Sequence, residues 1–448
     1  MLKTEKRAAL SLSLVYAFRM LGLFMILPVF SLYAHNYVGA TPILIGLAIG
    51  MYGLTQGIFQ LPFGFLSDRY GRKKIIVLGL LIFCAGSVVA AEAETIYQVI
   101  AGRALQGMGA IAAAVMALAA DLTREQVRIR IMAFIGMSIG LSFMLSMIIG
   151  PVIAARYGLS ALFWMTAGLS ILGILVIVLV TPQPHSQGFH RDAQLSLPDV
   201  GKIAADRELL KLDFGVFVLH LVLSATFVVF PLMLKNQLSI DVALHWKTYL
   251  PVFALSVVFL VPMVIIAEKF RKSRALFLFA VGLLVLAELG LALSGSYPAV
   301  FIMLVLFFTA FNFLEAVLPS TVARIAPADM KGTAMGLFSS TQFFGAFCGG
   351  LFGGWLLASE TYASTYFGLA ILLCAWFLVA LTMKAPKLLS SKIISLEDLG
   401  NEDLAQFLER AASIEGVCEV SVYEADRVAY LKVEKGFDQV ALDALVTR

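Results

Sequence analysis

Long apolar runs dominate this sequence and limit what the chain can fold into. Twelve of them, each close to the length that crosses a bilayer as a helix, lie at residues 10–33, 43–67, 75–91, 96–120, 131–155, 162–180, 212–234, 246–267, 275–295, 298–322, 333–358 and 362–383. In hydrocarbon every backbone N–H and C=O must pair within the chain, so such runs predict spanning helices and not buried strands. With 60% hydrophobic residues and a mean hydropathy of +0.92, we expect an all-α membrane protein.

Polar segments divide the runs into two sets of six. Between the sets, residues 181–211 hold three prolines and several charges, a composition typical of a linker. After Lys387 the sequence turns polar again, which predicts a soluble domain. The expected order is an N-terminal six-helix half, a cytoplasmic linker, a C-terminal six-helix half and a soluble cytoplasmic domain, at residues 1–180, 181–211, 212–385 and 392–448.

Basic residues are distributed unequally over the predicted loops. Alternate loops, together with the linker and both ends of the apolar part, hold 23 of them, whereas the opposite loops hold only Arg156, Lys235 and Lys247. Loops rich in Lys and Arg stay on the cytoplasmic side. The pattern predicts a multi-pass protein of a bacterial inner membrane with both termini in the cytoplasm. The net charge of +4 reflects this topology signal and does not indicate a nucleic-acid partner.

The two halves repeat at an offset of 200 residues. Asp68 matches Glu268 and Arg72 matches Lys272, so the loop between the second and third helices recurs between the eighth and ninth. Parallel repeats of this kind predict a pseudo-two-fold axis along the membrane normal. The substrate site is then expected between the halves, near the middle of the bilayer.

The segment GFLSDRYGRKK at residues 64–74 is the most specific motif in the chain. It resembles the helix 2 to 3 signature of the major facilitator superfamily, and together with the twelve runs and the repeat it extends the resemblance to about residue 385. The resemblance implies the major facilitator fold of two six-helix repeats and a transporter, not an enzyme. Gly64 would let two helices approach closely, and Gly71 would permit a tight turn.

The resemblance also implies a conformational latch at the cytoplasmic ends of the halves. Its charged members here would be Asp68, Arg69, Arg72, Asp121, Glu268 and Lys272. In the family the carboxylate at Asp68 faces the positive N-terminal end of helix 11, and Arg72 would pair with Asp121. The alternative is that these charges only fix the topology.

Two further motifs lie in helices 4 and 5. Arg103 begins the sequence RALQG, which is similar to the RxxQG pattern of proton-coupled family members. Its side chain could instead extend to the headgroups, because Arg103 is near the outer end of its helix. Gly150 and Pro151 resemble part of the glycine-rich antiporter motif of drug-efflux members, although Ala154 stands where a further glycine is usual.

A few ionisable side chains lie at depth in the predicted helices, where each needs a partner or a cavity. In this architecture helices 1, 4, 7 and 10 line the central path, which favours Arg19, Arg103, His220 and Glu315 over Glu288. We expect His220 and Glu315 to bind and release protons. The alternative is a static hydrogen-bonded pair. Asn312 could line the cavity or bond to a neighbouring helix.

The polar tail reads as strand 393–396, helix 402–412, strands 417–423 and 428–434 and helix 438–446. This order resembles a ferredoxin-like fold, and the first loop lacks the CxxC motif with which similar heavy-metal-associated domains bind metal. We therefore expect no metal and a regulatory or self-associating role. Such a tail on a facilitator resembles the YajR-like group of bacterial efflux proteins.

The leading hypothesis is a proton-coupled transporter that exports a small hydrophobic or amphipathic compound by alternating access in the bilayer. No cofactor is expected, because the sequence has no GxxxxGK[ST] phosphate loop. Two alternatives remain: a proton-coupled uptake symporter, and a membrane sensor or scaffold that no longer transports and binds a partner protein through its tail.

Overall fold

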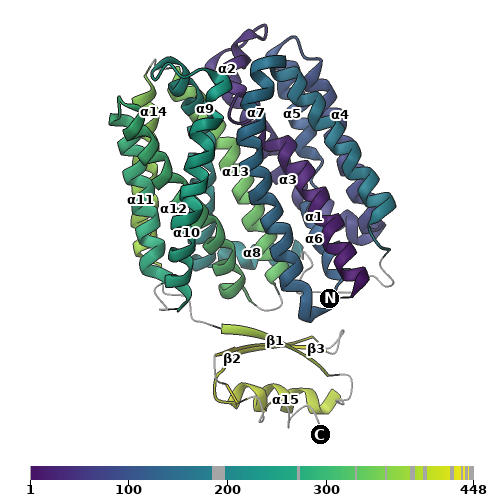
Figure 1. Ribbon diagram of the computed structural model, residues 1–448. Helices are drawn as coiled ribbons and strands as arrows, with labels where there is room; N and C mark the ends of the chain where they lie inside the picture. The colour runs from purple at the N-terminus through teal and green to yellow at the C-terminus, as the bar shows by residue number, and fades with distance from the viewer. Residues whose placement is uncertain are drawn as a thin grey trace.

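A computed structural model of the chain shows a bundle of long helices above a small α/β domain (Figure 1). It describes residues 2–183, 197–269, 273–327, 330–358, 361–383, 389–396, 401–423, 428–434, 437–438 and 442. The N-terminus and the small domain lie at the same end of the bundle (Figure 1). We call this the domain end, and the opposite one the far end.

The first half contains α1 Lys3–Phe24, α2 Phe30–Tyr33, α3 Pro42–Tyr70, α4 Arg72–Ala91, α5 Ile96–Met108, α6 Ala112–Asp121 and α7 Glu125–Leu175. Helix α7 has 51 residues, which would extend about 76 Å, far more than the roughly 30 Å of a hydrocarbon core. The chain turns at Gly158, whose φ of 76° is readily adopted only by glycine. The element labelled α7 is therefore two spans.

The second half contains α8 Leu197–Ala205, α9 Arg207–Asn236, α10 Trp246–Lys269, α11 Ser273–Leu293, α12 Tyr297–Ile325, α13 Lys331–Leu357 and α14 Tyr362–Leu381. Within the described residues, ten helices are long and apolar enough to cross a membrane. Counting α7 as two spans and adding the glycine-rich α13 gives the twelve that the sequence predicts.

Two of the predicted spans are interrupted. The run at 10–33 forms α1 only to Phe24, then a turn and the short α2, because Pro28 lacks the N–H that a continuing helix needs. The run at 96–120 divides at Gly109 into α5 and α6. Both breaks leave carbonyl groups for side chains to bind.

Helix α13 joins the two halves through glycines. On one side Gly350 lies against the backbone of Gly46 and Gly50 in α3, and on the other Gly349 lies against Leu221 in α9. A methyl group at any of these glycines would overlap backbone atoms of the partner helix. Small residues of this kind are what allow spanning helices to pack closely.

The halves meet toward the far end. The contacts between α3 and α13 run from Pro42 and Gly354 to Gly57, whose carbonyl accepts a hydrogen bond from Ser340 Oγ at 3.1 Å. Gly57 is about midway along α3. Further toward the domain end, a side chain at Gly64 would meet Ala113 of α6, in the same half.

The small domain contains β1 Leu389–Ser395, α15 Asn401–Ser413, β2 Val417–Tyr423 and β3 Val428–Glu434. Its strands pair antiparallel in the order β1-β3-β2, as in a ferredoxin-like split β-α-β unit. Both later strands have the predicted bounds, and β1 begins earlier than predicted. The second predicted helix, at 438–446, falls almost entirely outside the described residues.

The open face of the sheet contacts the bundle. Ala429, Leu431 and Val433 of β3 are buried in the domain core, so Lys432 between them points to the other face. Its Nζ donates a hydrogen bond of 3.0 Å to the carbonyl oxygen of Ile325, the last residue of α12. A cation at a helix C-terminus is favourable because the unpaired carbonyls carry partial negative charge.

We predict that Lys432→Ala loosens the domain end of α12. Loss of one hydrogen bond of about 1 kcal/mol should speed amide exchange around Ile325 by roughly fivefold. Hydrogen–deuterium exchange with mass spectrometry measures this directly. Arg410→Ala, a change to an exposed residue of α15 in the same domain, is the control and should leave the exchange unchanged; equal rates in all three proteins would contradict the contact.

Candidate functional site

Three polar side chains from three helices meet inside the second half. His220 of α9, Glu315 of α12 and Gln342 of α13 form a cluster in which His220 Nε2 lies 3.5 Å from Glu315 Oε2 and 2.7 Å from Gln342 Nε2. Gln342 Nε2 also donates to Glu315 Oε1 at 3.2 Å. The sequence predicted that His220 and Glu315 act together, and the structure places them in contact.

The cluster has a defined pattern of donors and acceptors. His220 Nδ1 lies 3.1 Å from the carbonyl oxygen of Val216, which can only accept, so Nδ1 carries a hydrogen. In the neutral ring Nε2 is then the acceptor for the Gln342 amide. The Glu315 side chain is 42% exposed and that of His220 only 11%, so the cluster is open on the carboxylate side.

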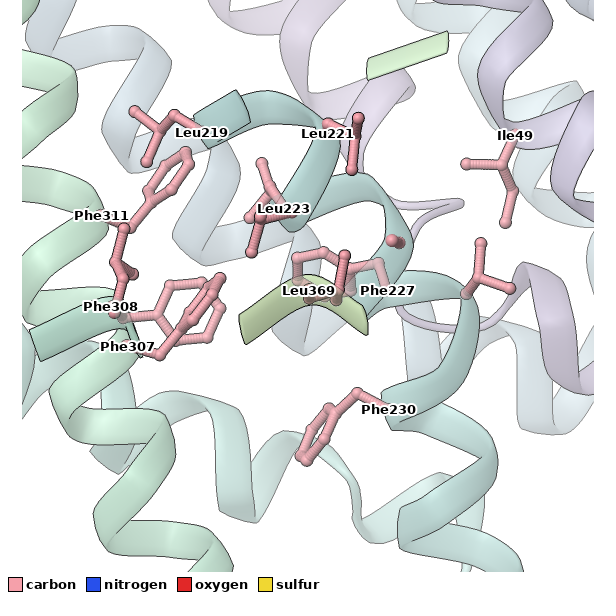
Figure 2. Close-up of a cluster of buried hydrophobic side chains, with 14 of the residues drawn as sticks. Ile49, Leu219, Leu221, Leu223, Phe227, Phe230, Phe307, Phe308, Phe311 and Leu369 are labelled. Atoms are coloured by element: carbon pink, nitrogen blue, oxygen red, sulfur yellow. The ribbon is translucent and has the colours of Figure 1, made fainter. Parts of the chain in front are cut away.

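An aromatic side chain packs against the histidine of this cluster. The Phe311 ring lies 5.8 Å from the His220 ring. Figure 2 shows Phe311 next to Leu219 of α9, with Phe308 and Phe307 of α12 near it. The Asn312 amide donates to Ser256 Oγ of α10 at 3.3 Å. Of the two alternatives for Asn312, the structure shows the hydrogen bond between helices.

Arg19 lies at the break between α5 and α6. Its guanidinium donates to Gln56 Oε1 of α3 at 2.6 Å and to the carbonyl oxygen of Gly109 at 2.9 Å. The side chain is 1% exposed and packs within 6.0 Å of the Tyr52 and Phe83 rings. Arg19 is thus buried within the first half, bonded to the carbonyl that the break at Gly109 leaves free. That it lines a central path stays a prediction.

Arg103 connects three helices of the same half. It donates to Gln106 Oε1 at 2.8 Å and to the carbonyl oxygen of Ala48 at 3.3 Å, and Gln106 in turn donates to Ser87 Oγ of α4. With an exposure of 2%, the side chain does not extend to the headgroups. The RALQG motif therefore builds a buried polar network between α5, α3 and α4.

The charges predicted to form the latch are partly assembled. Arg72 Nε lies 3.2 Å from Asp121 Oδ2, and Arg72 also forms an ion pair with Asp68. Gly71, with a φ of 101°, makes the turn between α3 and α4, and the Arg69 guanidinium lies over the Tyr70 ring.

Asp68 is not bonded to α13 within the described residues, which differs from the expectation that it faces the start of helix 11. The close contacts between α3 and α13 among the described residues lie between Pro42 and Gly57 of α3, before the chain reaches Asp68. In the repeat, Lys272 lies outside the described residues and the side chain of Glu268 is not described.

The antiporter-like motif marks a close contact between helices. Gly150 of α7 lies against the carbonyl oxygen of Met25, where α1 ends, so a side chain there would overlap the backbone. Pro151 follows inside α7. Gly150 thus lets the fifth span pack closely against the first, next to the break after Phe24.

Sequence reasoning missed Gln342, Gln56 and Tyr52. Gln56 donates to Gln60 Oε1 at 2.8 Å and the Tyr52 hydroxyl donates to Gln56 Oε1 at 3.2 Å, which extends the Arg19 network along α3. An uncharged amide in a spanning helix is a weaker signal than a charge, but its cost in hydrocarbon is also significant. A search for Gln and Asn within the runs would have found the two glutamines.

Two packed sets of six helices, with a polar cluster deep in one and a buried arginine network in the other, define a polytopic membrane transport protein. The family model described as Major Facilitator Superfamily matches residues 12–211 and 212–413. The chain therefore belongs to the major facilitator superfamily.

Individual relatives agree with this assignment. The chain is 44% identical over 433 residues to the inner membrane transport protein YajR of Escherichia coli (strain K12), covering 96% of this chain and 94% of that protein. It is 24% identical to the multidrug resistance protein MdtH of Aeromonas salmonicida, covering 75% and 83%. A solved bacterial homolog of the human lysosomal transporter Spinster, inward-facing and unoccupied, matches in fold with a TM-score of 0.69 at 16% identity, covering 86% of this chain and 98% of that one.

We predict that Arg103→Met destabilises the protein. The change leaves Gln106 Oε1 and the carbonyl oxygen of Ala48 without this donor, at a cost of about 2–4 kcal/mol. Heat-induced unfolding in detergent should show a melting temperature lower by about 5 °C. Arg156→Met, at an exposed arginine, serves as the control, and an equal melting temperature for both variants would contradict the buried network.

Proposed function

We propose that this protein is a proton-coupled secondary transporter that exports a small hydrophobic or amphipathic compound. The observation that carries the proposal is the contact of His220, Glu315 and Gln342 on helices α9, α12 and α13. An imidazole and a carboxylate within spanning helices are costly unless they are paired or face a cavity, and such residues are typical of proton pathways in transporters. The name of the more distant multidrug resistance relative supports export.

The proposed orientation places the domain end in the cytoplasm. Basic residues described at this end include Lys3, Arg72 and Arg124, and the distribution of Lys and Arg favours the cytoplasm for it. The structure, closed between the halves at the far end, then corresponds to a state open toward the cytoplasm. The membrane is proposed to be the inner membrane, as for the Escherichia coli relative.

The latch is proposed to form in the opposite state. Asp68 lies on α3 beyond the region where α3 meets α13, and α13 begins at Lys331 at the same end of the bundle. Closing the domain end brings the Asp68 carboxylate toward the positive end of the α13 dipole. Arg72 and Asp121 are proposed to hold Asp68 in position until then.

The soluble domain is proposed to regulate transport through α12. Lys432 holds the end of the helix that carries Glu315, so a partner that displaces the domain would act on that helix. This proposal gives the domain a role within a transporter and does not require a scaffold without transport.

We predict that Glu315→Gln and His220→Gln each abolish proton-driven transport, because neither side chain can then exchange the coupled proton. Everted vesicles with an acidic interior that contain the wild-type protein should accumulate amphipathic fluorescent dyes. With either variant the accumulation should be lower by at least about tenfold. Glu92→Gln, at an exposed carboxylate outside the spans, is the matched control. Accumulation driven only by the opposite gradient would support uptake instead.

A further inference from the structure

Arg19 brings a permanent positive charge into the interior of the first half. A buried guanidinium requires either a counter-charge or acceptors for all of its five N–H hydrogens. Its Nη2 donates to Gln56 Oε1 and to the Gly109 carbonyl oxygen. The other two nitrogens, Nε and Nη1, are buried and have no described partner. The fold therefore satisfies this charge only in part.

No carboxylate lies at the depth of Arg19 in the helices of the first half. Helices α4 and α5 contain no Asp or Glu, and Glu5 is 14 residues from Arg19, about 21 Å along α1. Four helices of this half have one acidic residue each, always in the first or last turn at the domain end: Glu5, Asp68, Asp121 and Glu125. The charge of Arg19 thus has no counter-charge from its own half.

A second buried guanidinium adds to the uncompensated charge. Arg19 Cζ and Arg103 Cζ both lie within 6.0 Å of the Tyr52 ring centroid. Arg103 likewise bonds to an amide and to backbone carbonyls. Aromatic rings and carbonyl oxygens attract cations but carry only partial negative charge. Because buried charges are normally paired, two positive charges without a negative one favour an anion as the missing partner.

The free nitrogens of Arg19 fit a two-bond contact with an anionic group. A carboxylate or phosphate binds a guanidinium along an edge that pairs Nη2 with either Nη1 or Nε. Both of these neighbours of Nη2 are free here. An anionic oxygen that replaces Gln56 Oε1 on Nη2 can therefore place a second oxygen on a free nitrogen. Since a charged acceptor binds more strongly than an amide oxygen, an anion would displace Gln56.

Gln60 connects this site with the joint between the halves. It lies about one turn beyond Gly57, where the glycine contacts of α3 with α13 end among the described residues, and residues three apart share a helix face. Its Oε1 accepts from Gln56, and no described acceptor faces its amide nitrogen. An anionic group that arrives from the domain end would meet this donor before it reaches Arg19.

We propose that Arg19 binds an anionic group of the transported compound, with Gln60 as a donor on the way to it. The ligand would be an amphipathic molecule with one oxyanion, a carboxylate or a sulfonate, on an apolar body. The inference rests on the proposed function and deepens it, because it specifies the charge of the exported compound. In the second half the polar cluster contains the Glu315 carboxylate and no arginine, so it is not suited to the same group.

The experiment measures heat-induced unfolding of the full-length protein in detergent at constant ionic strength. Three probes share an eight-carbon chain and differ in charge: octanesulfonate, octyltrimethylammonium and octanol. A ligand at a hundred times its dissociation constant raises the melting temperature by about 3 °C. We expect this shift with octanesulfonate only, and a smaller one with methanesulfonate, which has the same anionic group without the apolar chain. Octanesulfonate should also compete with dye accumulation in everted vesicles, and octyltrimethylammonium should not.

Gln56→Glu tests the site by supplying the missing charge from within. Its carboxylate would lie where Gln56 Oε1 now accepts from Arg19, and the Gln60 amide can turn its nitrogen toward the new oxygen. Without a probe this variant should melt about 3 °C above the wild type, and octanesulfonate should no longer shift it. Gln98→Glu, at an exposed glutamine near the start of α5, is the matched control and should keep the shift. Arg19→Gln should lose the shift, and Gln56→Glu is sufficient if that protein does not fold.

Three results would overturn the anion site. These are equal shifts with the anionic and cationic probes, a shift that persists in Gln56→Glu, and a Gln56→Glu protein that melts below the wild type. In the last case the charge of Arg19 is already compensated and the new carboxylate is the unpaired group. Equal shifts with methanesulfonate and octanesulfonate would overturn the amphipathic ligand, and octanesulfonate that binds without competing would overturn its assignment as the transported group.

The melting measurements are independent of the proposed proton coupling. They use no proton gradient, so a shift that Gln56→Glu removes would support the anion site whatever His220 and Glu315 do. The vesicle assay with Glu315→Gln and His220→Gln tests the coupling separately. Dye accumulation that survives in both of those variants would overturn the proposed function and leave the anion site in place.

Discussion

The close packing of α13 between α3 and α9 is the contact on which the arrangement of the two halves depends. Glycines at 46, 50, 349 and 350 bring the helix backbones together, which in lipid replaces the hydrophobic driving force that water would supply. Among the described residues, the glycine contacts with α13 lie between Pro42 and Gly57 of α3, toward the far end. A joint of this kind can hold the halves together at one end while the other end opens.

The two halves solve the problem of burying polar groups in different ways. In the first, Arg19 and Arg103 are fixed charges whose partners are amides and backbone carbonyls, and they stabilise the broken fourth helix. In the second, His220, Glu315 and Gln342 form a cluster of two ionisable groups and an amide. The proposed function assigns proton binding to the second half only.

Much of this architecture follows from the sequence because its causes are local. The lengths of the apolar runs predicted the twelve spans, and alternating apolar and polar residues predicted strands 417–423 and 428–434. The order of strands and helices in the tail predicted its sheet. The roles of Arg19 and Asp68 could not be read in the same way. Arg19 binds a carbonyl freed by the break at Gly109, and the partner of Asp68 depends on which end of the bundle is closed. Gln342 was missed because only the packing of α13 brings its uncharged amide to His220.

Two distances measured in one sample test the central claim, that the halves exchange contact at one end for contact at the other. Spin labels at exposed Val38 and Leu244 would report the far end, and labels at exposed Tyr70 and Arg274 the domain end. The account predicts that Asp68→Asn, which removes the charge that would hold the domain end closed, shortens the far-end distance and lengthens the domain-end distance in the population average. Two distances that stay fixed, or that change in the same direction, would contradict it.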